Sequence, residues 1–313
     1  MPPEYDVAVA YRIYPKVSRV PPVFPNDKYK LSELCLKSFK DSLGSLKVKM
    51  FVLLDNCPPS YEDLFKRYFD EQDLEFIRLN GVGNRATFDM QIEILLDQTF
   101  SEIVYFAEDD YLYLPNQFES MVKFLRDEDH VDFVSPYDHL DYYVLDLHNQ
   151  KNFIKFYNDK HWRTAASTCL TFLTTKTKLR KTQTVFQSYA KGNDDVSLWI
   201  SLTKRRLFNP LTILGYHRTN GHFFGIILHA WQFCWRQILF GKRQNLWVPI
   251  PSMATHLESD HLAPNFSWIT KHSETTIEQN TRTSDKQSVA NCFYVKNKSR
   301  IRNRYSLNPK LAN

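Results

Sequence analysis

The first 110 residues alternate between two hydrophobic patterns. Short continuous apolar runs, typical of buried strands, are separated by segments whose apolar residues recur at helical spacing. The predicted strands are 6–14, 48–56, 74–80 and 102–110, and the predicted helices are 30–43, 61–70 and 86–99. This alternation of strands and helices predicts an α/β fold, with a mostly parallel central sheet and helices on both of its faces.

The second half of the chain has a less regular pattern. The predicted strands are 131–138, 167–175 and 211–217, and the predicted helices are 194–206 and 222–243. From about residue 269 onward Ser, Thr, Asn, Lys and Arg dominate and the apolar periodicity ends, which is typical of a disordered basic tail. We therefore expect one domain at 1–268, with a regular half at 1–115 and an irregular half at 116–268, followed by a tail at 269–313.

Composition and charge narrow the class of protein. Apolar residues make up 43% of the 313 residues, so a sizeable core is expected, and the formal net charge of +5 weakly favours anionic partners. The five cysteines are widely spaced without a CxxC pair, which argues against a disulfide framework or a zinc site and for a reducing compartment. Neither a signal-peptide pattern nor an apolar run of 18 residues is present, so we expect a cytoplasmic location.

Three adjacent acids, Glu108, Asp109 and Asp110, directly follow the predicted strand that begins at residue 102. Crowded carboxylates repel one another, so a bound cation, a helix cap or solvent exposure must explain them. A strand end with one or two carboxylates suits Mg²⁺ or Mn²⁺ that bridges a nucleotide diphosphate. The alternative is a solvated acidic turn before a helix near Pro115. The position at the carboxyl end of the fourth strand favours the metal, because ligands of such sheets bind there.

Other polar residues stand at strand ends or helix starts in the first half. Arg12 lies in the first predicted strand, and Asp55 ends the second strand, where it either faces a ligand or forms an Asx turn before two prolines. Asn84 and Arg85 open the helix after the third strand. A helix N-terminus attracts phosphate, and arginine adds a fork-shaped donor. The alternative there is an ordinary helix start with a surface arginine.

The second half offers two acids and two histidines. Asp194 and Asp195 begin a predicted helix, where either acid can serve as a general base or simply cap the helix. His256 and His261 come late in the chain, and a neutral imidazole suits Mn²⁺. A lone surface histidine is the alternative for each of them.

With its strand order and the segment "YFAEDDYLYLP", the chain resembles the GT-A (Rossmann-like) glycosyltransferases, family 2-like, whose fourth strand ends in a D-x-D motif. The E-D-D variant is similar to that of N-acetylglucosaminyltransferase I-type enzymes. The resemblance covers roughly residues 5–260. It implies a metal-dependent inverting transferase of the hexosyl or N-acetylhexosaminyl type, which moves a sugar from a nucleotide-diphosphate donor, a UDP-sugar being favoured, to a hydroxyl group. The half at 1–115 would bind the nucleotide, and the half at 116–268 the acceptor.

The resemblance also implies roles for individual residues. Asp110 would be the main metal ligand, with His256 completing the site and His261 competing for that role. Glu108 would lie near the ribose or base and Asp109 near the sugar or metal. Asp195 would be the catalytic base, with Asp194 as its support or as the base itself. The nucleotide would also contact Arg12, Asp55, Asn84 and Arg85.

The predicted helix at 222–243 combines a polar stripe with a wide apolar surface rich in Trp and Phe. The stripe consists of His222, Gly225, His229, Gln232 and Arg236, and Lys242 and Arg243 follow. Such a helix either lies in a membrane interface or is a buried or oligomer-forming helix. The basic tail favours peripheral membrane association on the inner face, and hence an acceptor such as a lipid-linked glycan or a surface polysaccharide.

Two other function classes compete with the transferase. A sugar-nucleotide nucleotidyltransferase would carry a glycine-rich loop after its first strand, but the segment "YRIYPKVSRVPPVFP" has no glycine. A non-catalytic glycosyltransferase-like binding or membrane adaptor protein would explain the basic charge but not three acids at one strand end. Because those acids would repel phosphates of a polynucleotide, no nucleic-acid partner is expected.

Overall fold

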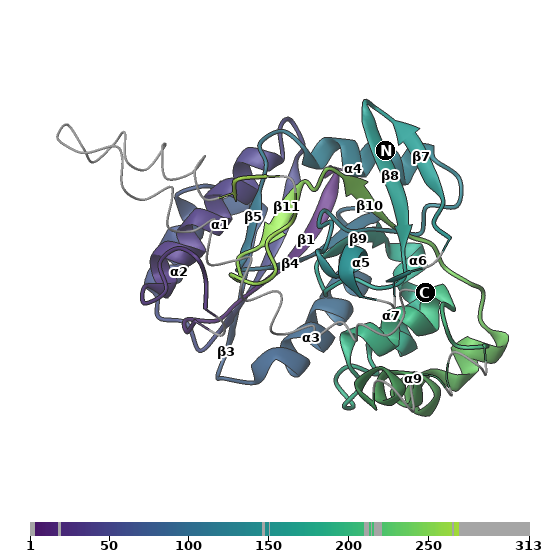
Figure 1. Ribbon diagram of the computed structural model, residues 1–313. Coiled ribbons are helices and arrows are strands. Elements are labelled where there is room, and N and C mark those ends of the chain that lie inside the picture. The colour runs from purple at the N-terminus through teal and green to yellow at the C-terminus, as the bar shows by residue number, and fades with distance from the viewer. Residues whose placement is uncertain are drawn as a thin grey trace, which may run out of the picture. The chain divides into compact units, whose positions relative to one another are not determined.

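The computed structural model describes residues 4–17, 20–145, 148, 149, 151–209, 213, 215, 221–264 and 266–268. By its internal contacts the chain divides into two units, Met1–Phe266 and Ser267–Asn313. The predicted tail at 269–313 lies outside the described residues. Every labelled helix and strand belongs to the first unit (Figure 1).

The centre of the first unit is a parallel set of strands. β1 (Val7–Ile13), β2 (Val48–Asp55), β3 (Leu74–Leu79) and β4 (Ile103–Glu108) lie in the order β3-β2-β1-β4, all parallel. Every residue of β1 and β2 is buried, as the continuous apolar runs predict for strands covered on both faces. The predicted α/β fold class is confirmed, because helices separate these strands along the chain.

Beyond β4 the sheet becomes mixed. The order continues with β9 (Phe172–Thr175), β6 (Phe133–Val134), β10 (Leu246–Ile250), β8 (Lys160–Ala165) and β7 (Ile154–Tyr157). β9 runs antiparallel to both β4 and β6, β10 is parallel to β6, and β7 and β8 form an antiparallel hairpin beside β10. The predicted strands at 131–138 and 167–175 correspond to the shorter β6 and β9.

Helices cover both faces of the sheet. One face carries α1 (Lys28–Ser42), α2 (Ser60–Lys66) and α4 (Phe118–Asp127), and the other carries α3 (Gly83–Asp97), α6 (Lys176–Phe186) and α7 (Asp195–Thr203). Successive strand residues point to opposite faces. Tyr105 of β4 therefore packs on Phe39 and Phe118, whereas its neighbour Phe106 packs on Phe88 and Phe172.

The long helix α9 (Gly221–Phe240) packs against α7. Ile226, Ile227 and Ala230 bury one of its faces against Ile200 of α7, and the helix is kinked at Cys234. No helix in the described part of the chain is long and apolar enough to cross a membrane. One face of α9 is therefore part of the core, as the alternative of a buried helix predicts, and the other face is exposed.

Some elements differ from the sequence-based predictions. Of the predicted strand at 211–217 only Ile213 and Gly215 are described, and both have helical geometry, so that prediction is wrong where it can be compared. The pattern did not reveal α6, β7, β8 or β10. It also missed the short strands β5 (Tyr111–Tyr113) and β11 (Ala254–His256), the 3₁₀ turn η1 (Glu71–Asp73) and the one-turn helix α5 (Asp141–Val144).

Candidate active site

A cleft of about 640 Å³ opens at the carboxyl ends of β1, β2 and β4. This volume lies within the range of about 300–1,000 Å³ that is typical of small-molecule pockets. The cleft is lined by eight of the predicted site residues, namely Arg12, Asp55, Asn84, Glu108, Asp109, Asp110, Asp195 and His256. Two others, Arg85 and Asp194, do not line it.

Each acid of the triplet contacts a different cationic side chain. Nη2 of Arg12 lies 2.5 Å from Oε1 of Glu108, and Nζ of Lys28 lies 2.8 Å from Oδ2 of Asp109. Nε2 of His256 lies 3.1 Å from Oδ2 of Asp110. An opposite charge at such distances favours the ionised carboxylate and offsets the repulsion between neighbouring acids. The triplet is therefore held by three separate ion pairs rather than by exposure to solvent, although at Asp109 burial outweighs the charge of Lys28 and raises the pKa of that carboxyl.

Glu108 has both carboxylate oxygens engaged. Oε1 accepts from Arg12, and Oε2 accepts from the hydroxyl of Thr171 at 2.7 Å. Arg12 also donates to the backbone carbonyl of Asn84 at 3.0 Å and to its side-chain oxygen. The Asn84 amide in turn donates to the Tyr189 hydroxyl at 3.1 Å. Glu108 and Arg12 thus join β1 and β4 to the start of α3, and this network forms one wall of the cleft.

Lys28 is a site residue that the sequence analysis missed. It is the first residue of α1, its side chain is only 8% exposed, and it lines the cleft. Burial works against its charge, but attraction to Asp109 and Asp110 outweighs burial and raises the pKa of Lys28 above its ordinary value. Oδ2 of Asp109 also accepts the backbone N–H of Tyr14 at 3.2 Å.

Asp110 differs from its two neighbours, because one of its oxygens has no partner. Oδ1 is buried and forms no hydrogen bond within the described part of the chain. Burial alone would raise the pKa of Asp110, but the charge of His256 holds it below the usual range for a carboxyl. Burial would lower the pKa of His256, but Asp110 raises it to about 9. A carboxylate oxygen without a partner beside an imidazole fits a divalent cation.

Strand pairing explains why His256 reaches Asp110. β5 immediately follows the triplet and pairs antiparallel with β11, with His256 opposite Tyr111. The backbone N–H of Leu257 donates to the carbonyl of Asp110 at 2.8 Å, which extends the pairing. His261, the competing candidate, has no contact with Asp110 among the described interactions, and its Nδ1 lies 3.1 Å from Oε2 of Glu258.

Asp55 holds the loop before α3. Oδ1 accepts the backbone N–H of Val82 and Oδ2 that of Gly83, both at 2.9 Å. Gly81 and Gly83 have φ angles of +71° and +85°, which glycine adopts without steric cost. The side chain of Asp55 therefore links the end of β2 to the start of α3 instead of forming a local Asx turn. Two of the N–H groups at this helix start are engaged by a carboxylate, so they are not available to the phosphate that we expected there.

Arg85 is not among the residues that line the cleft. Its side chain is exposed, and its guanidinium lies 5.9 Å from the centroid of the Tyr189 ring. This position agrees with the alternative of a surface arginine at an ordinary helix start.

Asp194 and Asp195 are adjacent but have different surroundings. Asp194 is the N-cap of α7, where it accepts the backbone N–H and the hydroxyl of Ser197, each at 2.7 Å. Its Oδ2 also lies 3.0 Å from Nδ1 of His229 on α9. Asp195 instead lines the cleft. Burial, reinforced by the charges of Asp194 and Glu108, raises the pKa of Asp195 to about 6 even though the Val196 N–H stabilises the ionised form.

No protein-family model matches the sequence, and no curated protein matches it. Among solved structures, the mannosyltransferase PcManGT from Pyrobaculum calidifontis, in complex with GDP-Man and Mn²⁺, shows 16% identity and a TM-score of 0.30. The match covers 42% of this chain and 35% of that chain, so this chain spans about a third of its length. A putative nucleotide-diphospho-sugar transferase from Desulfovibrio desulfuricans G20 shows 14% identity, covers 75% of this chain and 98% of that one, and has a TM-score of 0.39.

A cytidylyltransferase from Leptospira borgpetersenii shows 13% identity and a TM-score of 0.32, with 56% of this chain and 62% of that chain covered. These likenesses are too low, at TM-scores below 0.5, to support an inference about this chain. Its α/β fold class rests instead on its own sheet order and on the helices that cover both faces of the sheet.

Proposed function

We propose that this protein is a metal-dependent inverting glycosyltransferase that moves a sugar from a nucleotide-diphosphate donor, a UDP-sugar being favoured, to a hydroxyl group. The observation that carries the proposal is the composition of one cleft. It contains the Asp110–His256 pair, with a buried oxygen that has no partner, and also Asp195, whose pKa is raised to about 6. A cation and a general base are the two elements that such a transfer requires.

Asp110 and His256 would hold the metal ion, Mn²⁺ or Mg²⁺. The ion, when bound, would neutralise charge on the departing nucleotide diphosphate. His256 would give up its proton to act as a ligand, because a metal takes the neutral imidazole. On the nucleotide side, Asp55, Glu108 and Asp109 would position the donor, together with Arg12 and Asn84.

Asp195 would accept the proton of the acceptor hydroxyl. A carboxyl with a pKa of about 6 is a stronger base than an ordinary aspartate and is still mostly ionised at pH 7. Asp194, as the N-cap of α7, would support Asp195 by fixing the helix start from which it extends.

We also propose that the exposed side of α9 contacts an anionic membrane surface. Its exposed apolar residues are Leu228, Trp235, Leu239 and Phe240, with the last 79% exposed. Arg236, Lys242 and Arg243 are exposed beside them. Apolar side chains next to bases suit a surface of acidic lipid head groups. This contact would bring the cleft to a lipid-linked or surface-polysaccharide acceptor.

The Asp110→Ala variant should lose metal-dependent nucleotide binding. Calorimetric titration of the full chain with UDP, GDP, CMP and TDP, each with Mn²⁺ and with EDTA, should show the strongest binding for UDP with Mn²⁺. Because the ion loses a ligand, the variant should bind UDP with Mn²⁺ about tenfold more weakly or worse. Asp70→Ala is the matched control, since Asp70 is exposed and forms no side-chain cap. Equal UDP affinity with Mn²⁺ and with EDTA would contradict the metal's role.

The Asp195→Asn variant should lose turnover but not donor binding. A positioned base contributes about 10²–10⁴-fold, so kcat for sugar transfer, or for donor hydrolysis with water as acceptor, should fall by that factor. Asp194→Ala should mainly destabilise α7, by about 1 kcal/mol, because it removes the side-chain cap. If Asp195→Asn retained the kcat of the wild type, the assignment of Asp195 as the base would be contradicted.

The pH dependence provides a separate check on Asp195. Below its pKa of about 6 the carboxyl is protonated and cannot accept a proton, so kcat/KM at saturating Mn²⁺ should fall about tenfold per pH unit on the acid side. Asp195→Asn should abolish this acid limb. An acid limb that persists unchanged in the variant would assign the titration to another group.

Replacement of the apolar residues of α9 should weaken membrane binding. In co-sedimentation with vesicles of phosphatidylcholine and phosphatidylglycerol, Trp235→Ser/Leu239→Ser/Phe240→Ser should reduce binding about tenfold or more, since less apolar area enters the interface. The control is Phe153→Ser/Phe156→Ser, which removes exposed apolar residues near and within β7. High salt should also weaken binding of the wild type. If the triple variant of α9 bound the vesicles as tightly as the double-variant control, the proposed membrane contact would be contradicted.

A further inference from the structure

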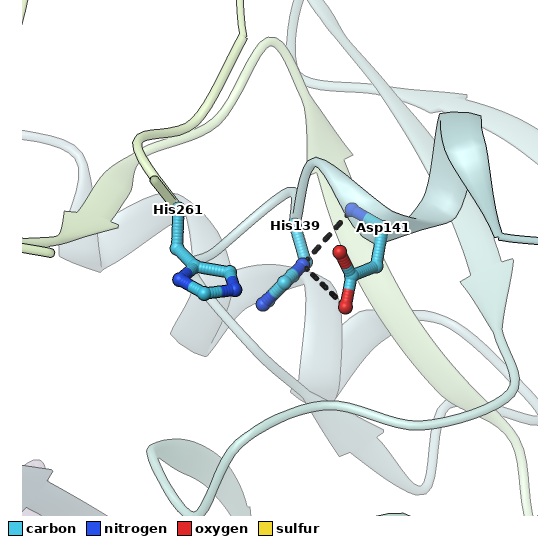
Figure 2. A group of neighbouring side chains, drawn as sticks. All are labelled: His139, Asp141 and His261. Carbon is cyan, nitrogen blue, oxygen red and sulfur yellow. Dashed lines mark hydrogen bonds and ion pairs between the residues drawn. The ribbon is translucent and has the colours of Figure 1, made fainter. Parts of the chain in front are cut away.

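A cluster of three potential metal ligands lies at the edge of the cleft, apart from the Asp110–His256 pair. One ring nitrogen each of His139 and His261 and one carboxylate oxygen of Asp141 all lie within 4.8 Å of one another. Figure 2 shows the two rings and the carboxylate facing one another, from the turn before α5, the first residue of α5 and the loop after β11. His139 and His261 also line the cleft.

We propose that His139, Asp141 and His261 form a second divalent-metal site, which takes Zn²⁺ or a similar transition metal. Two imidazoles and one carboxylate are ligands that Zn²⁺ accepts in tetrahedral sites with a fourth, open position. The hard ions Mg²⁺ and Ca²⁺ prefer oxygen ligands instead. The site does not depend on the proposed glycosyl transfer, because it uses none of the residues assigned to metal or base in that reaction.

To bind an ion, the ligand atoms, which lie within 4.8 Å of one another, must move closer together. Bond lengths of about 2.0–2.2 Å place the ligand atoms of tetrahedral zinc about 3.3 Å apart. Nδ1 of His139 already lies 3.6 Å from Oδ2 of Asp141. The same Nδ1 accepts the backbone N–H of Asp141 at 3.0 Å, so an ion bound to this nitrogen would replace one hydrogen bond.

The charge state of His139 suits a metal ligand. Nδ1 of His139 accepts the backbone N–H of Asp141 at 3.0 Å, so this nitrogen carries a lone pair rather than a proton. A neutral imidazole is the form that binds a metal.

The carboxylate of Asp141 lacks a strong cation. Within the described part of the chain its Oδ2 lies 3.6 Å from Nδ1 of His139, and neither lysine nor arginine pairs with it. A divalent ion would supply the missing positive charge.

Neighbouring contacts hold the two histidine-bearing segments together. The hydroxyl of Tyr137 donates to the backbone carbonyl of His261, and Tyr137 forms a β-bridge to Ala254. Nδ1 of His261 lies 3.1 Å from Oε2 of Glu258, and one ring nitrogen of His261 faces His139 (Figure 2). A carboxylate on the second nitrogen is a common support for a metal-bound imidazole.

Cobalt binding to the full chain tests this site with a readout other than activity. Co²⁺ replaces Zn²⁺, and its visible absorption reports a site with nitrogen ligands. The measurement is made in the Asp110→Ala background, which disables the other proposed metal site. We expect about one equivalent of Co²⁺ with a visible band, and displacement of the band by Zn²⁺. Adding His139→Ala or His261→Ala should weaken Co²⁺ affinity about 100-fold or more.

One control variant and one further site variant complete the test. His161→Ala, an exposed histidine of β8, should leave the Co²⁺ band unchanged. Asp141→Asn keeps the shape of the side chain and should weaken Co²⁺ binding at least tenfold, with far-ultraviolet circular dichroism showing that the variant is folded. The proposal is overturned if Asp110→Ala binds no Co²⁺, or if the folded His139, Asp141 and His261 variants bind it as tightly as the His161 control.

Discussion

The cleft depends on one constraint, the separate neutralisation of three consecutive acids. Arg12 comes from β1, Lys28 from the start of α1 and His256 from β11, and each contacts a different member of the triplet at 2.5, 2.8 and 3.1 Å. Removing one partner from a buried ion pair leaves an uncompensated charge and is strongly destabilising, by about 3–5 kcal/mol. The three ion pairs therefore link distant parts of the chain at the same point, and the cleft forms where they meet.

In this arrangement, neighbouring acids of similar chemistry also have different partners. Glu108 has both oxygens engaged and Asp109 is held by Lys28, so within the described residues only Asp110 of the triplet presents a buried oxygen without a hydrogen-bond partner. Asp194 and Asp195 differ in the same way, because one caps α7 while the other lines the cleft with a raised pKa. Position within the fold, rather than residue type, separates structural acids from those available for chemistry.

The sequence predicted the parallel strands and the place of the triplet because both depend on local patterns. Continuous apolar runs mark β1, β2 and β4, and the acids follow the last of them directly. The polar alternation of β7 and β8, the proline within β10 and the shortness of β5 and β11 left no such signal.

There are also physical reasons why the sequence does not reveal some residues of the site. Lysine is almost never buried unless it is paired, so nothing in the sequence singles out Lys28.

The sequence indicates His256 as a metal ligand only by its residue type and its place along the chain. Its contact with Asp110 follows from the register of β5 and β11, which pairs residues 111 and 256 and cannot be read from local periodicity. His139 and Asp141 lie in a turn without a pattern, and His261 joins them only through tertiary structure.

The most direct test of the central claim is a double-mutant cycle between Lys28 and Asp109, measured as the free energy of unfolding in urea. Lys28→Met and Asp109→Asn remove one charge each while largely keeping side-chain size. If each acid is held by its own cation, both single variants should be destabilised and the double variant should be more stable than their sum predicts, with a coupling of about 1–3 kcal/mol. Additive effects, within about 0.5 kcal/mol, would contradict the account, because the triplet would then be stable without its ion pairs.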